Sequence, residues 1–289
     1  MMKSFLFVVL MLVTPVLFAE DITILVDGVK KQTLSMDEIR KMKSETIEFF
    51  EHVTNSTELY VGVPTSYLFK KVYPEYEQAS EVELISSTEY KYLEPMSRII
   101  ENMSIMAYDR ADNQKFVRFS KTQKMLVPLG PLYHVWNMAG KKNGERLEMR
   151  TTYQIIAINF ITKHAIALKE GLEDKELTMG LANYKQHCIS CHAIGKYGGE
   201  IGVDLVKRKV LEKKGGPYIL KYILTPNAVN PKTKMLPLPA FKDREEKAKA
   251  IVTFLEFMEN PNEYFKKNAV RKDSSTFQEL KKLMEEIKK

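Results

Sequence analysis

The chain has 289 residues, 44% hydrophobic and 10% aromatic, which suggests about two domains with packed cores and excludes a globally disordered protein. Its 44 Lys and Arg residues face 37 Asp and Glu residues, for a formal net charge of +7. Because both signs are mixed along the chain, we expect no nucleic-acid partner. The mild positive excess can steer an acidic partner or hold the protein near an anionic membrane surface, and a solvated basic surface explains it equally well.

The first 19 residues predict a signal peptide. Lys3 supplies a positive start, residues 5–13 form an uninterrupted apolar run, and Ala19 is a small residue at the expected cleavage site. The apolar run is too short to cross a bilayer comfortably, so we expect cleavage, export to the periplasm and a soluble mature protein. Leu17 is bulkier than the residue expected two positions before the cut, which leaves an uncleaved N-terminal anchor as the alternative.

Residues 20–168 carry both strand and helix signals. Helices are expected after Ser35, where Glu38 completes a capping box, and after Pro64. Strands are expected from β-branched and aromatic runs at residues 22–26, 82–85, 90–93, 125–129 and 153–158. Together these signals predict an α+β module with a mainly β core.

A charged stretch at residues 169–176 marks the end of this module. Beyond it, helices are expected at residues 178–187, 217–224 and 245–258, the last with one apolar stripe. We expect residues from about 170 to 262 to have a hydrophobic core of their own. Residues 263–289 read as a charged tail with one more amphipathic helix.

The chain has two cysteines, Cys188 and Cys191, in the sequence Cys-Ile-Ser-Cys-His. An exported protein with no other cysteine has no disulfide framework to build. Two thiols three positions apart can each add across one vinyl group of a haem, and the adjoining His192 is then held beneath the ring as an iron ligand. The motif therefore predicts one covalently attached haem c.

Two other kinds of site use a similar cysteine spacing. A zinc site needs four ligands, and the chain has no second cysteine pair. A thioredoxin-like dithiol needs the motif after a strand of a βαβ unit, whereas a helical segment leads into it here. Covalent haem is therefore favoured over both.

Met235 is the expected second axial ligand of the haem iron. It lies in a proline-rich loop, residues 234–241, which can present a thioether to the open face of the ring. Met179 and Met258 stand at helical positions, where core packing is the usual reason for a methionine. His187 is the main competitor, but it directly precedes a tethering cysteine and cannot easily reach the far face. An open sixth coordination position is the remaining alternative.

With these residues in place, residues 174–262 resemble a class I cytochrome c. Gly180 and Tyr184 are similar to that family's first helix, in which the glycine lets the last helix cross closely. Residues 198–205 resemble the segment that turns beneath the haem. The resemblance implies an all-α mono-haem domain.

Two positions depart from the family pattern. Val203 stands where the family usually has proline, and Leu236 separates Met235 from the proline that usually follows it directly. The resemblance still implies that His192 and Met235 are the axial ligands. It also implies one-electron transfer, with a Met/His pair favouring the reduced state.

Residues 20–168 more faintly resemble the molybdopterin-binding fold of sulfite oxidase-like proteins. The segments that match in order and spacing are residues 62–68, 82–92, 105–108 and 125–128. In that family a cysteine thiolate ligates molybdenum. This region contains no cysteine, so we expect no molybdopterin chemistry.

His134 and Trp136 are the most site-like residues of this first module, although a lone histidine among aromatics is more often a packed residue. The whole pattern predicts a periplasmic electron carrier whose first module docks a redox partner. One alternative is a haem-containing oxidoreductase whose first module binds a small substrate. Another is a sensor or assembly factor whose first module binds a partner. The identity of the partner and the oligomeric state stay open.

Overall fold

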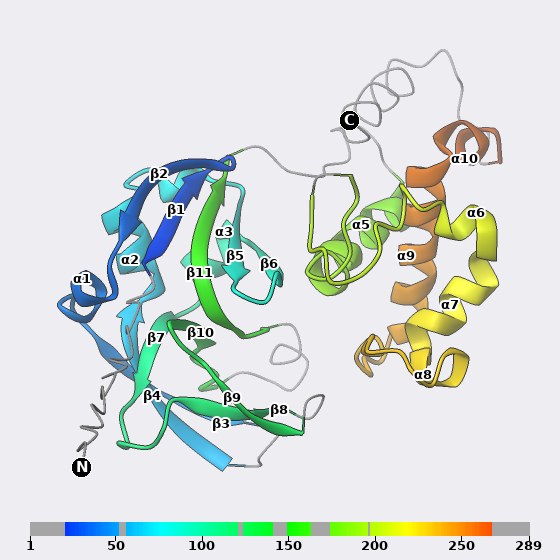
Figure 1. The fold of residues 1–289 in the computed structure, drawn as a ribbon. Helices are drawn as coiled ribbons and strands as arrows, with labels where there is room; N and C mark the ends of the chain where they lie inside the picture. Colours follow the sequence, from blue (N-terminus) through cyan, green and yellow to red (C-terminus); the bar gives the residue numbers. More distant parts are fainter. Residues whose placement is uncertain are drawn as a thin grey trace, which may run out of the picture.

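The structure, a computed structural model, describes residues 21–51, 56–120, 124–140, 149–162, 174–195 and 197–267. Its strands lie within residues 21–162, here called the sheet region, and most of its helices lie within residues 174–267, here called the helical region (Figure 1). The expected signal peptide, most of the charged boundary and the expected tail helix fall outside the described residues, so these stay predictions.

A mixed sheet forms the sheet region. Its nine strands are β1 (Ile22–Val26), β2 (Val29–Leu34), β3 (Glu45–Glu51), β4 (Ser56–Pro64), β5 (Glu81–Ser86), β6 (Lys91–Pro95), β7 (Ser104–Arg110), β10 (Leu132–Trp136) and β11 (Thr152–Ile161). They follow the order β2-β1-β11-β10-β7-β4-β3, and β5 pairs with both β11 and β6. Strand β11 is parallel to β1 and antiparallel to β10 and β5, so this long curved strand joins the parts of the sheet (Figure 1). Strands β8 (Val117–Ser120) and β9 (Met125–Pro128) form a separate pair.

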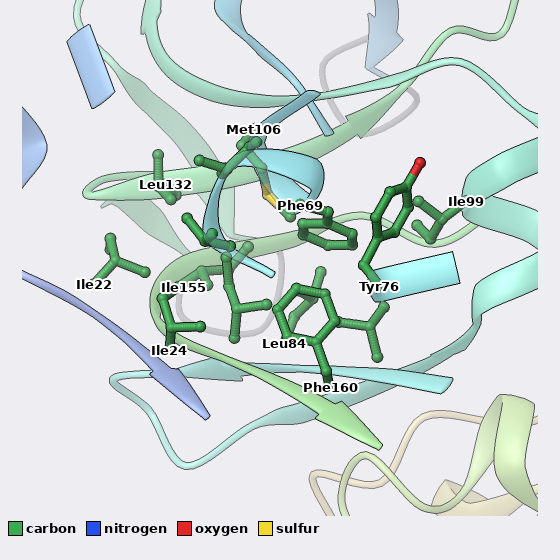
Figure 2. Close-up of a cluster of buried hydrophobic side chains, with 14 of the residues drawn as sticks. Ile22, Ile24, Phe69, Tyr76, Leu84, Ile99, Met106, Leu132, Ile155 and Phe160 are labelled. Atoms are coloured by element: carbon green, nitrogen blue, oxygen red, sulfur yellow. The ribbon is translucent and has the colours of Figure 1, made fainter. Parts of the chain in front are cut away.

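One face of this sheet is covered by helices α1 (Met36–Arg40), α2 (Thr65–Val72) and α3 (Met96–Glu101) and by a 3-10 turn (Tyr76–Gln78). Figure 2 shows the apolar side chains that meet there. The ring of Phe69 lies 5.0 Å from that of Phe160 and 6.0 Å from that of Tyr76, edge to face in both pairs. The capping box of Ser35 and Glu38 and the helix after Pro64 are confirmed.

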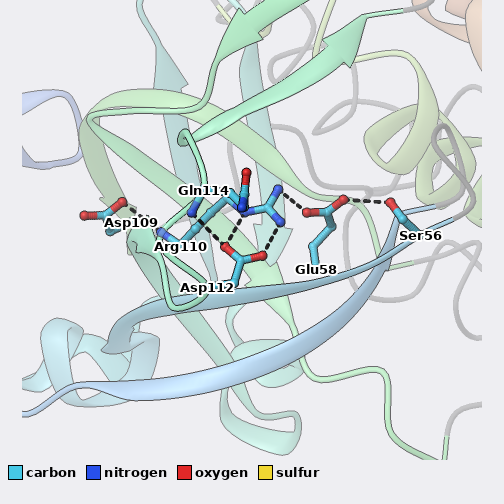
Figure 3. Close-up of polar contacts among 6 residues, drawn as sticks. All are labelled: Ser56, Glu58, Asp109, Arg110, Asp112 and Gln114. Atoms are coloured by element: carbon cyan, nitrogen blue, oxygen red, sulfur yellow. Dashed lines mark hydrogen bonds and ion pairs between the residues drawn. The ribbon is translucent and has the colours of Figure 1, made fainter.

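A charged network fastens the neighbouring strands β4 and β7 at their ends (Figure 3). The Arg110 guanidinium forms ion pairs with Glu58 and Asp112, and Ser56 Oγ donates to Glu58 Oε1 at 2.7 Å. The hydrogen bonds from Arg110 lower the pKa of Asp112 to about 2. Each of these carboxylates is matched by a donor, so we interpret the cluster as structural.

The helical region consists of α5 (Lys175–His187), α6 (Val210–Lys214), α7 (Gly216–Leu224), α8 (Pro226–Val229), α9 (Arg244–Glu259) and α10 (Pro261–Lys267). Helix α5 crosses α9 at Gly180, as expected from the sequence. A Cβ atom on Gly180 would lie 2.1 Å from the Ala250 carbonyl oxygen and 2.7 Å from Phe254 Cβ. Only a glycine therefore permits this approach of the two backbones.

The fold class predicted from the sequence, an α+β module followed by an all-α mono-haem cytochrome c domain, is wrong. The described residues instead hold one large mixed sheet of nine strands together with nine α-helices, most of them in the last third of the chain. The individual helices expected at residues 178–187, 217–224 and 245–258 are found as α5, α7 and α9. What failed is the assembly of these elements into a separate all-α unit.

The physical reason is a hydrophobic core that the sheet and the helices share. Successive residues of a strand point to opposite sides, and β6 uses both sides: Tyr92 is buried in the sheet core, whereas Leu93 is buried among the helices. Ile161, near the end of β11, belongs to the same helical core as Tyr184 and Phe254. The helical region therefore does not close its core alone, contrary to our expectation for residues 170–262.

Polar contacts join the same two regions. Lys185 of α5 forms an ion pair of 2.6 Å with Glu81 of β5, and the Lys91 N–H of β6 donates to the Ser190 carbonyl at 3.4 Å. Ser190 lies between the two cysteines, so the edge of the sheet reaches the cysteine motif directly.

Candidate functional site

The cysteine motif forms a tight turn at the end of α5. The Cys188 N–H donates to the Tyr184 carbonyl at 2.8 Å and so continues the hydrogen bonding of the helix. The N–H groups of Cys191 and His192 then both donate to the Cys188 carbonyl, at 3.1 and 2.9 Å. These bonds hold two thiols and one imidazole on a single turn, and both cysteines are free and partly buried.

A glycine-rich loop, residues 198–204, wraps this turn. The Gly199 N–H donates to the Ile189 carbonyl and the Gly202 N–H to the Cys191 carbonyl, each at 2.7 Å. A Cβ atom on Gly202 would lie 2.4 Å from Cε1 of the His192 ring. The His192 imidazole therefore packs directly against the backbone of Gly202, and any side chain at position 202 would clash with the ring.

The loop also fixes the tautomer of His192. Its Nδ1 lies 2.9 Å from the Val203 carbonyl oxygen. A carbonyl only accepts, so Nδ1 carries the proton and Nε2 keeps its lone pair. Burial lowers the pKa of His192, which favours the neutral ring. A metal-ligating histidine is held in the same way, with one nitrogen bonded to a carbonyl and the other left to the metal.

Burial holds both thiols in the protonated form. It raises the pKa of Cys188 to about 12 and raises the pKa of Cys191 as well, and the nearby charge of Arg150 opposes both shifts. Reactive dithiols of the thioredoxin type need a lowered thiol pKa. Cys188 and Cys191 instead have a raised pKa, and their motif follows a helix. Both observations argue against the dithiol alternative.

Met235 lies in the loop between α8 and α9. Its N–H donates to Thr233 Oγ1 at 3.2 Å, and the Leu238 N–H donates to the Ile223 carbonyl at 3.0 Å. The Leu238 bond ties the loop to α7 just after Met235, which is half-buried and packs against the same helical core as Cys188. The competing Met258 is almost fully buried inside that core, as expected of a packing residue.

His187, the competing histidine, is engaged elsewhere. Its Nδ1 lies 2.6 Å from an Nη2 atom of Arg150, and its ring packs against Phe241 at 5.3 Å between centroids. Burial, with the charge of Arg150 as the next cause, lowers the pKa of His187 to about 3. The ring is therefore neutral, with one nitrogen already occupied.

His134 and Trp136 both lie in β10 and are fully buried. Their rings meet edge to face at 4.6 Å, and burial lowers the pKa of His134 to about 3. Within the described residues neither ring nitrogen of His134 has a hydrogen-bond partner. Trp136 Nε1 donates to the Arg150 carbonyl at 2.9 Å. These are the properties of core residues, and the tryptophan also fixes the backbone that carries Arg150.

Comparisons with known proteins add no family. No family model matches the chain, and no curated protein sequence matches it either. The resemblances to class I cytochrome c and to the sulfite oxidase-like fold therefore rest on the motifs alone.

The described part of the chain contains no cluster of three or more His, Cys, Asp or Glu side chains that could hold a metal ion, whereas a haem iron takes only two axial ligands from the protein. Within the same residues no helix has the length and apolar character needed to cross a membrane.

Two participants of this site escaped the sequence reasoning. The Val203 carbonyl was expected only as part of a loop, because the bond comes from the backbone and not from the side chain. Arg150 lies in a different region from the motif and 37 residues before His187 in the chain. No motif or spacing marks it, so only the fold brings it to the cysteines.

Proposed function

We propose that this chain is an exported, periplasmic c-type cytochrome that carries one haem and transfers single electrons. The observation that carries the proposal is the Cys188–His192 turn, in which two free thiols precede an imidazole whose Nδ1 is hydrogen-bonded to the Val203 carbonyl. This arrangement leaves one nitrogen lone pair available beside two unpaired thiols. The proposal concerns this site, and it does not require a separate all-α unit.

The residues fit a covalent haem. Cys188 and Cys191 would tether it by two thioethers, His192 Nε2 would bind the iron on one side, and Met235 would bind it on the other. When bound, the haem supplies one-electron chemistry, with its iron alternating between Fe(III) and Fe(II). The chain's own part is to hold these ligands: Gly202 and Val203 orient the imidazole, and the pinned loop presents the thioether.

The charge distribution favours an acidic redox partner. Residues 174–267 carry 17 basic and 11 acidic side chains, whereas residues 21–162 carry 18 and 19. Within residues 207–234, next to Met235, eight basic side chains face the single acidic Glu212. We expected residues 20–168 to dock the partner. The charges favour docking on the helical region instead, where a basic surface can raise the rate of encounter.

Retention of haem through denaturation tests the proposal. The haem of the purified chain should stay with the polypeptide in acid-acetone extraction and denaturing electrophoresis, because two thioethers hold it. Cys188→Ala together with Cys191→Ala should abolish retention, and Ser190→Ala, in the same turn, should not. A haem that washes out of the unaltered chain, or a purified chain without haem, would overturn the proposal.

Ligand assignment is tested by spectra and potential. Met235→Ala should remove the weak absorption at the red edge that marks a bond from sulfur to iron(III), and should lower the reduction potential. Met179→Ala and His187→Ala serve as matched controls that should keep the band. If either control loses the band while Met235→Ala retains it, the assignment of Met235 is wrong.

The enzyme alternative stays a prediction. It needs a polar pocket in the sheet region within reach of the haem. A surface hollow lined by Leu224, Thr225 and residues 240–246 belongs to the helical region and includes no residue of the sheet.

A further inference from the structure

Arg150 links the sheet region to the cysteine motif. It lies just before β11, and its backbone carbonyl accepts the Trp136 Nε1 proton at 2.9 Å. Its half-buried side chain reaches the end of α5, where Nη2 lies 2.6 Å from His187 Nδ1. A rigid core residue thus anchors one end of Arg150, and the residue before the first cysteine holds the other.

This contact fixes the tautomer of His187. A guanidinium only donates, so Nδ1 must accept, and the proton of the neutral ring is placed on Nε2. That nitrogen is buried and has no hydrogen-bond partner within the described residues. A nitrogen that carries a proton has no lone pair for a metal. His187 and His192 are therefore held in opposite tautomers, one by a donor and the other by an acceptor.

The same guanidinium places a fixed positive charge at the motif. It lies against His187, the residue directly before Cys188. Its charge adds to burial in lowering the pKa of His187, and it opposes the rise that burial causes in the pKa of both cysteines. The charge of Arg150 also opposes the rise that burial causes in the pKa of Glu94. The Glu94 carboxylate is already ion-paired with Arg98 at 3.0 Å. The charge of Arg150 is thus only partly neutralised. A positive charge near a redox centre favours the reduced state, since reduction adds one negative charge.

We infer that Arg150 is a positioning residue of the proposed haem site, which keeps His187 from binding the iron and keeps a positive charge beside Cys188 and Cys191. The effect of Arg150 on the haem rests on the proposed function, whereas the tautomer of His187 is a property of the protein alone. It assigns part of the electron-transfer site to the sheet region, through one side chain that no motif reveals.

The test of the charge is the midpoint potential of the haem-loaded full chain. Arg150→Gln keeps a hydrogen-bond donor and loses the charge, and should lower the potential. Arg150→Lys keeps both a donor and the charge, so its midpoint potential should stay closer to that of the unaltered chain than the potential of Arg150→Gln does. Lys185→Gln is the matched control: it breaks the Glu81–Lys185 ion pair of the same interface and removes one positive charge. Its potential should fall less than that of Arg150→Gln.

The test of the tautomer is the nitrogen chemical shifts of the histidine side chains in the ¹⁵N-labelled full chain, reduced where haem is present. His187 should carry its proton on Nε2, and Arg150→Leu should remove this preference while His192 keeps its own. This readout does not depend on haem, so a chain that lacks haem would end the proposed function and leave this result standing. A His187 proton on Nδ1, or equal potentials in Arg150→Gln and Lys185→Gln, would overturn the inference.

Discussion

The polar clusters of the two regions differ in whether their groups are already paired. In the sheet region, Arg110, Glu58 and Asp112 satisfy one another at the edge of β4 and β7 (Figure 3), and positive and negative charges nearly balance. In the helical region the cysteine turn buries two thiols and a neutral imidazole that keeps a free lone pair, and basic side chains are in excess. In the sheet-region cluster the three side chains are already paired with one another. Within the described part of the helical region only Nδ1 of the His192 ring is bonded, to the Val203 carbonyl, so Nε2 stays available to a ligand.

The two regions are nevertheless one structure. Leu93 and Ile161 belong to the helical core, and Arg150 reaches the cysteine turn from the sheet. The cysteine turn and the core beneath it therefore draw on both regions, which predicts that the two regions gain and lose stability together.

The largest effect is expected at the crossing of α5 and α9. Gly180→Leu places a side chain where even a Cβ atom would lie 2.1 Å from the Ala250 carbonyl. The two helices must then separate, so we expect a loss of more than about 4 kcal/mol in the free energy of unfolding. Urea unfolding followed by circular dichroism measures it. Ala182→Leu, on the exposed side of the same helix, should change this free energy by less than about 0.5 kcal/mol, and an equal loss there would contradict the crossing.

The second prediction concerns the shared core. Leu93→Ala removes a buried strand side chain from among the helices, and should lower the free energy of unfolding by about 2–4 kcal/mol. Because the core is shared, both regions should lose stability together. Trp136, the single tryptophan, reports on the sheet region by its fluorescence, and the absorption of the proposed haem would report on the helical region. Their urea transitions should coincide in the unaltered chain and in the variant. Separate transitions would show two independent units.

This shared core marks the limit of what the sequence could predict. The capping box of Ser35 and the helices at α5, α7 and α9 follow from local patterns, and these predictions are confirmed. The fold class was wrong because apolar alternation in β6 shows that Tyr92 and Leu93 face opposite sides, but not which partner each side meets. The same limit applies at the site. The Cys188–His192 motif is local and visible, whereas Arg150 and the Val203 carbonyl reach it only through tertiary structure.

The third prediction is a pH dependence at the junction of the regions. Burial raises the pKa of Glu94 to about 7 from its ordinary 4.5, against the charges of Arg98 and Arg150. The folded state thus binds this proton more tightly than the unfolded state, so its stabilising effect is complete below about pH 4.5 and is lost as the pH rises to about 7. Over that window the stability of the unaltered chain relative to Glu94→Gln should fall by about 2–3 kcal/mol.

Urea unfolding of the two proteins at several pH values between 4.5 and 8 measures this difference. His134, whose folded pKa is about 3, acts in the opposite direction: its contribution is complete above about pH 6.5 and is lost as the pH falls. Both proteins contain His134, so its effect cancels in the comparison. A difference in stability that stays constant with pH would contradict the raised pKa of Glu94.

The smallest effect is expected from surface charge, and it tests which region would meet the proposed redox partner. Lys207, Lys213 and Lys221 are exposed in the helical region, and Lys30, Lys31 and Lys70 are exposed in the sheet region. Replacing either set with Gln lowers the net charge by the same amount. If electrons leave through the helical region, oxidation by ferricyanide, an anion, should slow about three- to tenfold at low salt for the first set and less than about twofold for the second.

Salt separates steering from loss of structure. The Debye length falls from about 30 Å at 0.01 M to about 3 Å at 1 M salt, so the rate difference between the two triple variants should vanish at high salt. Stopped-flow absorption of the haem measures both rates, and equal free energies of unfolding show that neither fold was damaged. A larger effect from the sheet-region lysines would place the docking surface on the sheet, as first expected for residues 20–168, because each set differs from the other only in the region that carries the charge.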